Sequence, residues 1–184
     1  MKSVSRREFV KQAASFGAAL MWATRGAQAS SIGWQERRDL FPQGVASGDP
    51  APDSIILWTR RPPVDKAASR LTVEIAEDLA FRRVVGTSVT SISADADWTC
   101  RVLVAGLKPR TVYWYRFTDD LGFGSRVGRS MTAPAANDDR SVNFAFVSCQ
   151  DINEGKLTAY RRMIFEDERA RAADQLGFVL HLGD

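Results

Sequence analysis

Short runs of β-branched and aromatic residues recur through the middle of the chain, and this repetition is the strongest constraint on its fold. The runs occupy residues 54–59, 71–76, 84–89, 98–104, 112–118 and 126–132. Turn-forming residues such as Pro62-Pro63 and Gly122 separate them. Several short strands at this spacing are typical of a sandwich in which two antiparallel sheets enclose one core. We therefore predict a mainly β fold.

Two local patterns refine this prediction. Cys100, Val102 and Val104 alternate with Thr99, Arg101 and Leu103, which gives that strand one largely apolar face. The turn at Leu107 and Pro109, followed by a tyrosine, resembles the tyrosine corner of immunoglobulin-like and fibronectin-III-like sandwiches. We predict such a domain over residues 38–133. Tyr113 is its structural residue, with the ring in the core and the phenol bonded to upstream backbone.

Aromatic residues in this region allow two interpretations. Aromatic side chains on alternating strands are usually core or half-buried packing. The same side chains could also form a platform that binds sugars. The residues concerned are Trp58, Trp98, Trp114 and Tyr115.

The N-terminus has the three parts of a cleavable export signal. A positively charged start precedes a weakly apolar run at residues 13–23, and an Ala-x-Ala site follows it. The run is too short to span a bilayer. Paired arginines followed by phenylalanine resemble a twin-arginine signal, which exports folded proteins. We predict a signal over residues 1–29, the twin-arginine machinery as partner, and a periplasmic or secreted location. The signal residues are Arg6, Arg7 and Phe9, and the cleavage residues are Ala27 and Ala29.

Charge excludes one class of partner. The formal net charge is +3, but residues 1–29 hold five cations and one anion, whereas the remainder holds 20 cations and 21 anions. A processed chain that is almost neutral lacks the counterion-release drive that nucleic-acid binding needs. No later stretch reaches 18 consecutive apolar residues, so we expect no stable membrane span.

A second domain follows a polar linker at residues 134–141. Residues 142–147 and 177–182 are nearly continuous apolar runs, typical of parallel strands covered on both faces. A helical pattern between them carries Leu157, Tyr160 and Ile164 on one face. Together they predict a β-α-β unit within residues 142–184.

The two predicted strands end on residues that can bind a metal. A right-handed crossover makes the strands parallel, so Cys149 and Asp184 are expected at the same sheet edge. A thiolate suits iron or zinc, and a carboxylate suits most divalent ions. The alternatives are a buried packing cysteine and an aspartate that caps the next turn. His181 is read as a satisfied core or edge histidine.

Sequence blocks along almost the whole chain resemble the alkaline phosphatase D family, in the family's own order. The most specific block is Gly44-Val45-Ala46-Ser47-Gly48-Asp49-Pro50, and residues 55–60 continue it. Residues 113–117 and 125–129 resemble the end of the family's N-terminal sandwich domain. Residues 146–150, 159–161 and 178–184 resemble the first motifs of its calcineurin-like metallophosphatase domain.

The resemblance implies an exported phosphoric ester hydrolase that uses iron and calcium and a metal-activated water. Cys149 would match the family's iron thiolate, and Asp184 the aspartate that bridges iron and the second metal. The family pattern continues with a tyrosine and several hundred residues that carry further ligands. We therefore expect residues 142–184 to be an incomplete metallophosphatase domain, and this chain alone to be inactive and not to retain the metals. The alternative function is a stand-alone exported sandwich that binds a glycan or a protein partner.

Overall fold

The computed structural model describes residues 18–23, 26–64, 70–151, 153 and 156–184. Arg6, Arg7 and Phe9 of the predicted signal lie outside the described residues. The chain divides into two compact units, Met1–Ala136 and Asn137–Asp184. This division falls inside the stretch that the sequence predicts as a linker.

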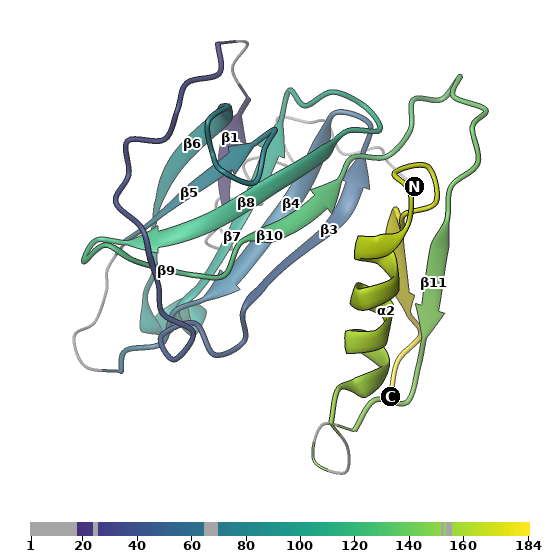
Figure 1. The fold of residues 1–184 in the computed structure, drawn as a ribbon. Helices are drawn as coiled ribbons and strands as arrows, with labels where there is room; N and C mark the ends of the chain where they lie inside the picture. The colour runs from purple at the N-terminus through teal and green to yellow at the C-terminus, as the bar shows by residue number, and fades with distance from the viewer. Residues whose placement is uncertain (1–17, 24–25, 65–69, 152, 154–155) are drawn as a thin grey trace, which may run out of the picture. The chain divides into compact units, whose positions relative to one another are not determined.

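The first unit is a sandwich of two sheets (Figure 1), so the predicted mainly β fold is confirmed. One sheet has the strand order β1 (Ala18–Trp22), β7 (Thr99–Ala105), β4 (Ser54–Arg60) and β3 (Val45–Ala51). The other has the order β2 (Gln35–Glu36), β9 (Phe123–Gly124), β8 (Val112–Asp119), β5 (Arg70–Ala76) and β6 (Val84–Ser91), with β10 (Gly128–Met131) also paired to β8. A short 3₁₀ turn, η1 (Ala94–Ala96), leads into β7.

The core of the sandwich follows from alternation along its strands. On β4, Ile55 and Leu57 are fully buried, while Trp58, the next residue, is only half-buried. On β7, Cys100, Val102 and Val104 are buried, as their spacing predicts. These side chains share one cluster with residues of the opposing sheet, so both inner faces are dry.

Tyr113 has the geometry of a tyrosine corner. Its phenol oxygen accepts a hydrogen bond from the backbone N–H of Lys108 at 3.0 Å. The ring is 1% exposed and packs in the core cluster with Leu107. Burial raises the pKa of the phenol. The turn between β7 and β8 is therefore tied to the core through one side chain.

Four of the described strands of this unit were not predicted from the sequence; β2 and β9 have two residues each, and β1 and β3 are longer. β3 carries glycine and proline and is mostly exposed, features that weaken a strand signal; it lies at the sheet edge, where such residues are tolerated. β1 lies within the apolar run that the sequence assigns to the export signal. The described part of that run is therefore a strand of the sandwich.

Two charged pairs are buried in the first unit. Arg61 Nε lies 3.1 Å from Asp119 Oδ2, and both side chains are almost fully buried. Arg116 Nη2 lies 2.8 Å from Glu74 Oε2, and these side chains are 10% and 3% exposed. Ser30 joins the second pair: its hydroxyl donates to Glu74 at 2.6 Å and accepts from Arg116 at 2.9 Å. The segment that follows the predicted signal is thereby held on the sandwich.

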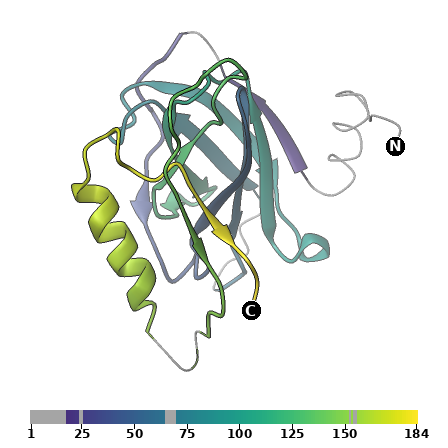
Figure 2. The same cartoon turned by 90° about the vertical axis from the view of Figure 1, so that its right-hand side faces the viewer.

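The second unit is a β-α-β unit, as predicted. β11 (Phe144–Val147) and β12 (Phe178–His181) are parallel neighbours, with Val147 opposite His181. Helix α2 (Thr158–Arg169) connects them, and Figure 2 shows both arrows pointing the same way.

Ion pairs and hydrogen bonds stabilise α2 and the segment after it. Arg162 and Glu166 form an i, i+4 ion pair on α2. The helix ends at Arg169, and the Asp167 carboxylate accepts the N–H of Leu176 in the segment that follows. Arg171 pairs with Asp174 at 2.7 Å.

The strands of this unit are not covered on both faces. None of the described residues in 137–184 is buried, and all four residues of β12 are exposed. Phe146 is 70% exposed and Leu182 is 66% exposed. A sheet of two strands with one helix leaves these apolar side chains without neighbours.

Candidate metal-binding edge

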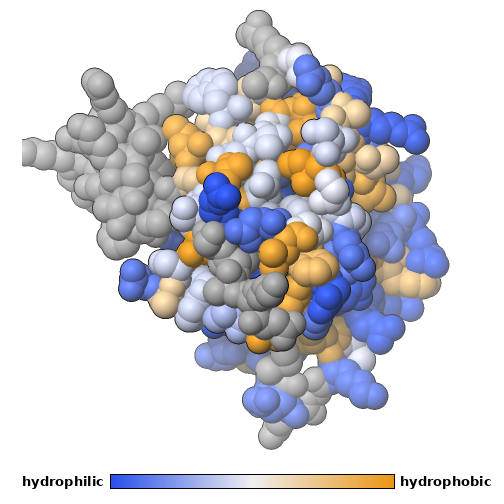
Figure 3. Space-filling view, turned by 90° about the vertical axis from the view of Figure 1, so that its left-hand side faces the viewer, coloured by the Kyte–Doolittle hydropathy of each residue, from blue (hydrophilic) through white to orange (hydrophobic). Residues whose placement is uncertain are grey.

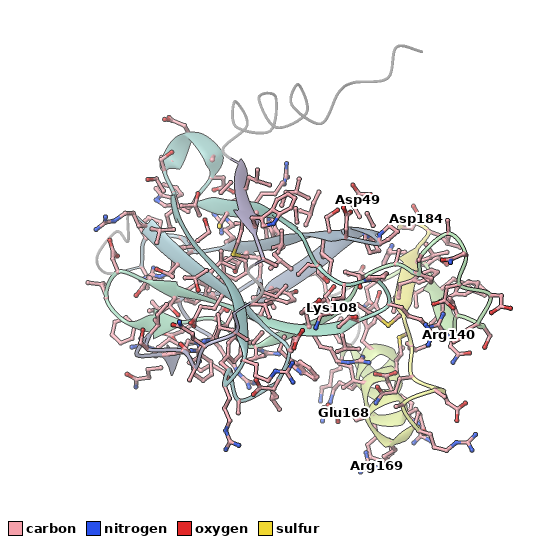
Figure 4. All side chains as sticks on the ribbon, turned by 90° about the horizontal axis from the view of Figure 1, so that it is seen from above. Asp49, Lys108, Arg140, Glu168, Arg169 and Asp184 are labelled. Atoms are coloured by element: carbon pink, nitrogen blue, oxygen red, sulfur yellow. The ribbon has the colours of Figure 1, made fainter. Side chains whose placement is uncertain are left out.

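Cys149 and Asp184 lie at the same edge of the second unit's sheet. Cys149 comes two residues after β11, and Asp184 three residues after β12. Because the strands are parallel neighbours in register, both segments leave the sheet at its carboxyl-terminal edge. Figure 4 labels Asp184, which follows β12 at this edge.

Backbone hydrogen bonds hold the two segments side by side beyond the strands. Leu182 donates its N–H to the Val147 carbonyl at 2.8 Å. Cys149 donates its N–H to the Gly183 carbonyl at 3.0 Å, and Gln150 donates to the carbonyl of Asp184. The thiol and the carboxylate therefore project from adjacent, mutually bonded backbone.

The backbone at this edge has a left-handed conformation at both candidate ligand residues. Cys149 has φ 56° and Asp184 has φ 66°, values that are uncommon for residues with a Cβ. Gly183, with φ 101°, supplies the turn directly before the aspartate. Such conformations concentrate at functional sites.

His181 is on β12, and the structure places it at an exposed position rather than in a core. Its Nδ1 accepts the N–H of Gly183 at 3.1 Å. It is thus a satisfied edge histidine, one of the two interpretations that the sequence allowed.

The donors at this edge fit part of a metal site. A thiolate and a carboxylate together suit iron or zinc and an oxygen-preferring ion beside it. Within the described parts of the chain, no three His, Cys, Asp or Glu side chains lie close enough together to hold a metal ion. Two donors are fewer than the four that a closed protein site uses. Cys149 and Asp184 therefore fit such a centre as a subset of its ligands.

A groove in the first unit was not foreseen from the sequence. It has a volume of about 470 Å³ and is lined by residues 43–47 and 126–129 together with Tyr115. A Cβ on Gly128 would lie 2.3 Å from the Tyr115 ring, so only glycine fits there. Burial raises the pKa of Tyr115 to about 12. Most of its lining comes from two blocks that the sequence analysis singled out for another reason, residues 44–50 and 125–129.

The aromatic residues considered as a sugar platform do not share a surface. Trp58 alternates with buried residues of β4 and faces out from one sheet, whereas Trp114 alternates with buried residues of β8 in the other. Tyr115 is 2% exposed. On the face of the sandwich seen in Figure 3, apolar side chains lie in small groups among polar ones. Core and half-buried packing is therefore the interpretation that fits.

The predicted cleavage residues are accessible. Ala27 and Ala29 are exposed. Among the helices within the described ranges, none combines the length and apolarity that crossing a membrane requires.

Comparison with known proteins gives concordant similarities. Residues 26–134 match the family described as "PhoD-like phosphatase, N-terminal domain". The chain is 37% identical over 152 residues to alkaline phosphatase D of Bacillus subtilis (strain 168), covering 78% of this chain and 24% of that protein. It is also similar to a solved structure of PhoD, with TM-score 0.65 and 34% identity, over 86% of this chain and 29% of that one. The chain thus spans about a quarter of the length of the curated relative.

Proposed function

This chain belongs to the PhoD-like phosphatase family, and on that premise we propose that it is the N-terminal portion of an exported, metal-dependent alkaline phosphatase and phosphodiesterase. The observation that carries the proposal is the shared edge of β11 and β12, where the topology brings together a thiolate and a carboxylate. The similarity to alkaline phosphatase D covers 78% of the chain in the sequence comparison, and the similarity to the structure of PhoD covers 86% of it.

We assign Cys149 as a ligand of iron and Asp184 as a carboxylate shared between iron and a second metal, calcium. Backbone hydrogen bonds between residues 149–150 and 183–184 hold the two segments side by side, which supports this assignment. Metals bound there would activate water and offset the charge of a phosphate ester during hydrolysis. Because two donors do not complete the site, this chain by itself is expected to bind little metal and to be inactive.

A chimera tests the role of Cys149. Residues 30–184 would replace the aligned region of Bacillus subtilis alkaline phosphatase D, and iron content and phosphodiester hydrolysis would be measured. Cys149→Ser should abolish stoichiometric iron and lower activity by at least about 100-fold, since loss of even an outer partner of a metal ligand commonly has effects of this order. Residues 30–184 alone should show neither iron nor hydrolysis.

The other cysteine is the matched control. Cys100 is buried in the sandwich core, so the chimera with Cys100→Ala should keep its iron. A Cys149→Ser chimera that retains full iron and activity would refute the assignment. Stoichiometric iron with turnover in residues 30–184 alone would refute the expected inactivity.

We also propose export by the twin-arginine route with cleavage after Ala29. Two features support it: Ala27 and Ala29 are exposed, and Ser30 hydrogen-bonds to Glu74 and Arg116 in the sandwich. Removal of residues 1–29 would therefore leave that anchor in place.

Replacing Arg6 and Arg7 together by lysine should remove most of the processed chain from the exported fraction of a bacterium that has the twin-arginine machinery. The measurement is immunoblotting of exported and retained fractions. Arg25→Lys, which also preserves charge, should leave export unchanged. Undiminished export of the double variant would exclude this route.

A further inference from the structure

The strand β1 closes one side of the sandwich. It lies parallel to β7, with Ala18 opposite Arg101 and Trp22 opposite Ala105, and Ala23 continues the pairing through an N–H bond to the Ala105 carbonyl at 2.7 Å. Without β1, β7 would be an edge strand of its sheet, and β6 is an edge strand of the other sheet. Figure 1 shows β1 beside both.

Side chains of β1 alternate between the core and the surface. Met21 is 3% exposed and belongs to the core cluster, whereas Leu20 is 45% exposed. A Cβ on Gly86 of β6 would lie 3.2 Å from the Met21 sulfur, so this glycine makes room for the methionine. Met21 thus reaches from the edge of one sheet to the edge strand of the other.

The aromatic ring at the end of β1 lies against a second glycine. A Cβ on Gly106 would lie 2.9 Å from Trp22 Nε1, and Gly106 has φ 78°. The edge of β7 therefore offers backbone for pairing, while Gly86 of the neighbouring β6 leaves room for Met21 and Gly106 leaves room for the Trp22 ring; together these features fit one extended apolar strand.

We propose that the edge of β7 is a docking surface whose occupant is the chain's own residues 18–22. In the unprocessed chain, residues 18–22 of the export signal's apolar segment are an edge strand of the folded sandwich, with Met21 in the core. Cleavage after Ala29 removes this strand and leaves β7 as a free edge. The docking of β1 stands on the contacts alone; only its link to cleavage rests on the proposed export.

A consequence is that residues 18–22 are not available to a membrane or a protease while they are paired with β7. The pairing of Gln28 with Val84 in both directions, at 2.9 and 3.3 Å, continues the attachment to the cleavage site. Strand release must therefore precede insertion of the apolar segment into a membrane or a protease site.

Thermal unfolding of the full chain, followed by tryptophan fluorescence, tests the docking. All five tryptophans precede residue 137, so the fluorescence reports unfolding of the first unit. Met21→Asp should lower the Tm by about 5 °C or more, toward the Tm of residues 30–184, because the charge prevents insertion. Leu20→Asp also replaces an apolar side chain of this segment by a charged one, but residue 20 faces the solvent. This variant should therefore have a Tm within about 2 °C of the wild-type value.

Hydrogen exchange of residues 99–105 gives the second readout. Amides of β7 should exchange at least about tenfold faster in Met21→Asp and in residues 30–184 than in the wild type or in Leu20→Asp. Equal Tm values and equal exchange for the two aspartate variants would overturn the proposal. The two variants could show the expected differences in Tm and in hydrogen exchange while the wild-type chain is not exported from cells. That result would refute the proposed export but not the docking of β1.

Discussion

Replacing Arg116 by methionine is expected to lower the free energy of unfolding of the sandwich by about 3–5 kcal/mol, because the substitution strands a buried carboxylate. Arg116 donates to Glu74 through Nε at 2.9 Å and lies over the Phe81 ring at 4.2 Å. Without the guanidinium, the buried Glu74 carboxyl would keep its hydrogen bond from the Ser30 hydroxyl but lose the cation that lies beside it. Urea unfolding of the full chain, followed by tryptophan fluorescence, measures the change.

A double variant separates the buried charge from lost packing. Glu74→Met combined with Arg116→Met removes both charges and should recover most of the lost stability, since apolar replacement of a buried pair is often neutral. Arg60→Met breaks the pair with Asp97, whose side chain is 69% exposed, and should change stability by less than about 1 kcal/mol. A double variant no more stable than Arg116→Met would show that the buried carboxylate is not the cause.

The strands that could be predicted from the sequence are the runs rich in β-branched and aromatic residues. β4 and β7 are two such runs, and every second residue of each is buried. β3 could not be predicted, because its pairing with β4 overrides the turn preference of glycine and proline. β1 could not be predicted either, because a short apolar run has the same composition in an export signal and in a buried strand.

Contacts between residues that are far apart in the sequence account for much of what could not be predicted. Glu74 and Arg116 are 42 positions apart, and nothing local in either strand indicates that the two side chains meet. Both lie in the sheet face that the segment after residue 29 covers, and Ser30 completes the cluster. Pairing of charges inside a β-sandwich thus depends on the register of β5 and β8, which sequence periodicity does not specify.

The candidate site was more accessible to sequence reasoning than its surroundings. The crossover rule alone brings Cys149 and Asp184 to one sheet edge, and the parallel pairing of β11 with β12 has this topology. The left-handed backbone at both residues was not foreseeable, since neither cysteine nor aspartate requires it. The groove beside Tyr115 depends on β3 and on Gly128, and it was missed with them.

Raising the pH above 9 is expected to destabilise the sandwich through Cys100. Burial raises the pKa of this thiol from 9.0 to about 12. Between these values the unfolded chain loses the proton and the folded chain keeps it, so unfolding releases a proton and becomes more favourable as the pH rises. The stability that the neutral thiol contributes is complete below pH 9 and is lost at about 1.4 kcal/mol per pH unit, to a total of about 4 kcal/mol near pH 12.

Comparison with Cys100→Ala isolates this contribution, because Tyr113 and Tyr115, whose pKa values burial also raises, are present in both proteins. At pH 8 the alanine variant should be the less stable of the two, since it leaves a small cavity among Val102, Val104 and their neighbours. Its free energy of unfolding, measured in urea with a reductant present, should then fall less steeply with pH, so that the two curves cross above pH 9. Cys149→Ala, at the exposed cysteine of the second unit, should follow the wild type throughout. Parallel curves for wild type and Cys100→Ala from pH 8 to pH 11 would mean that the buried thiol does not couple folding to alkaline pH.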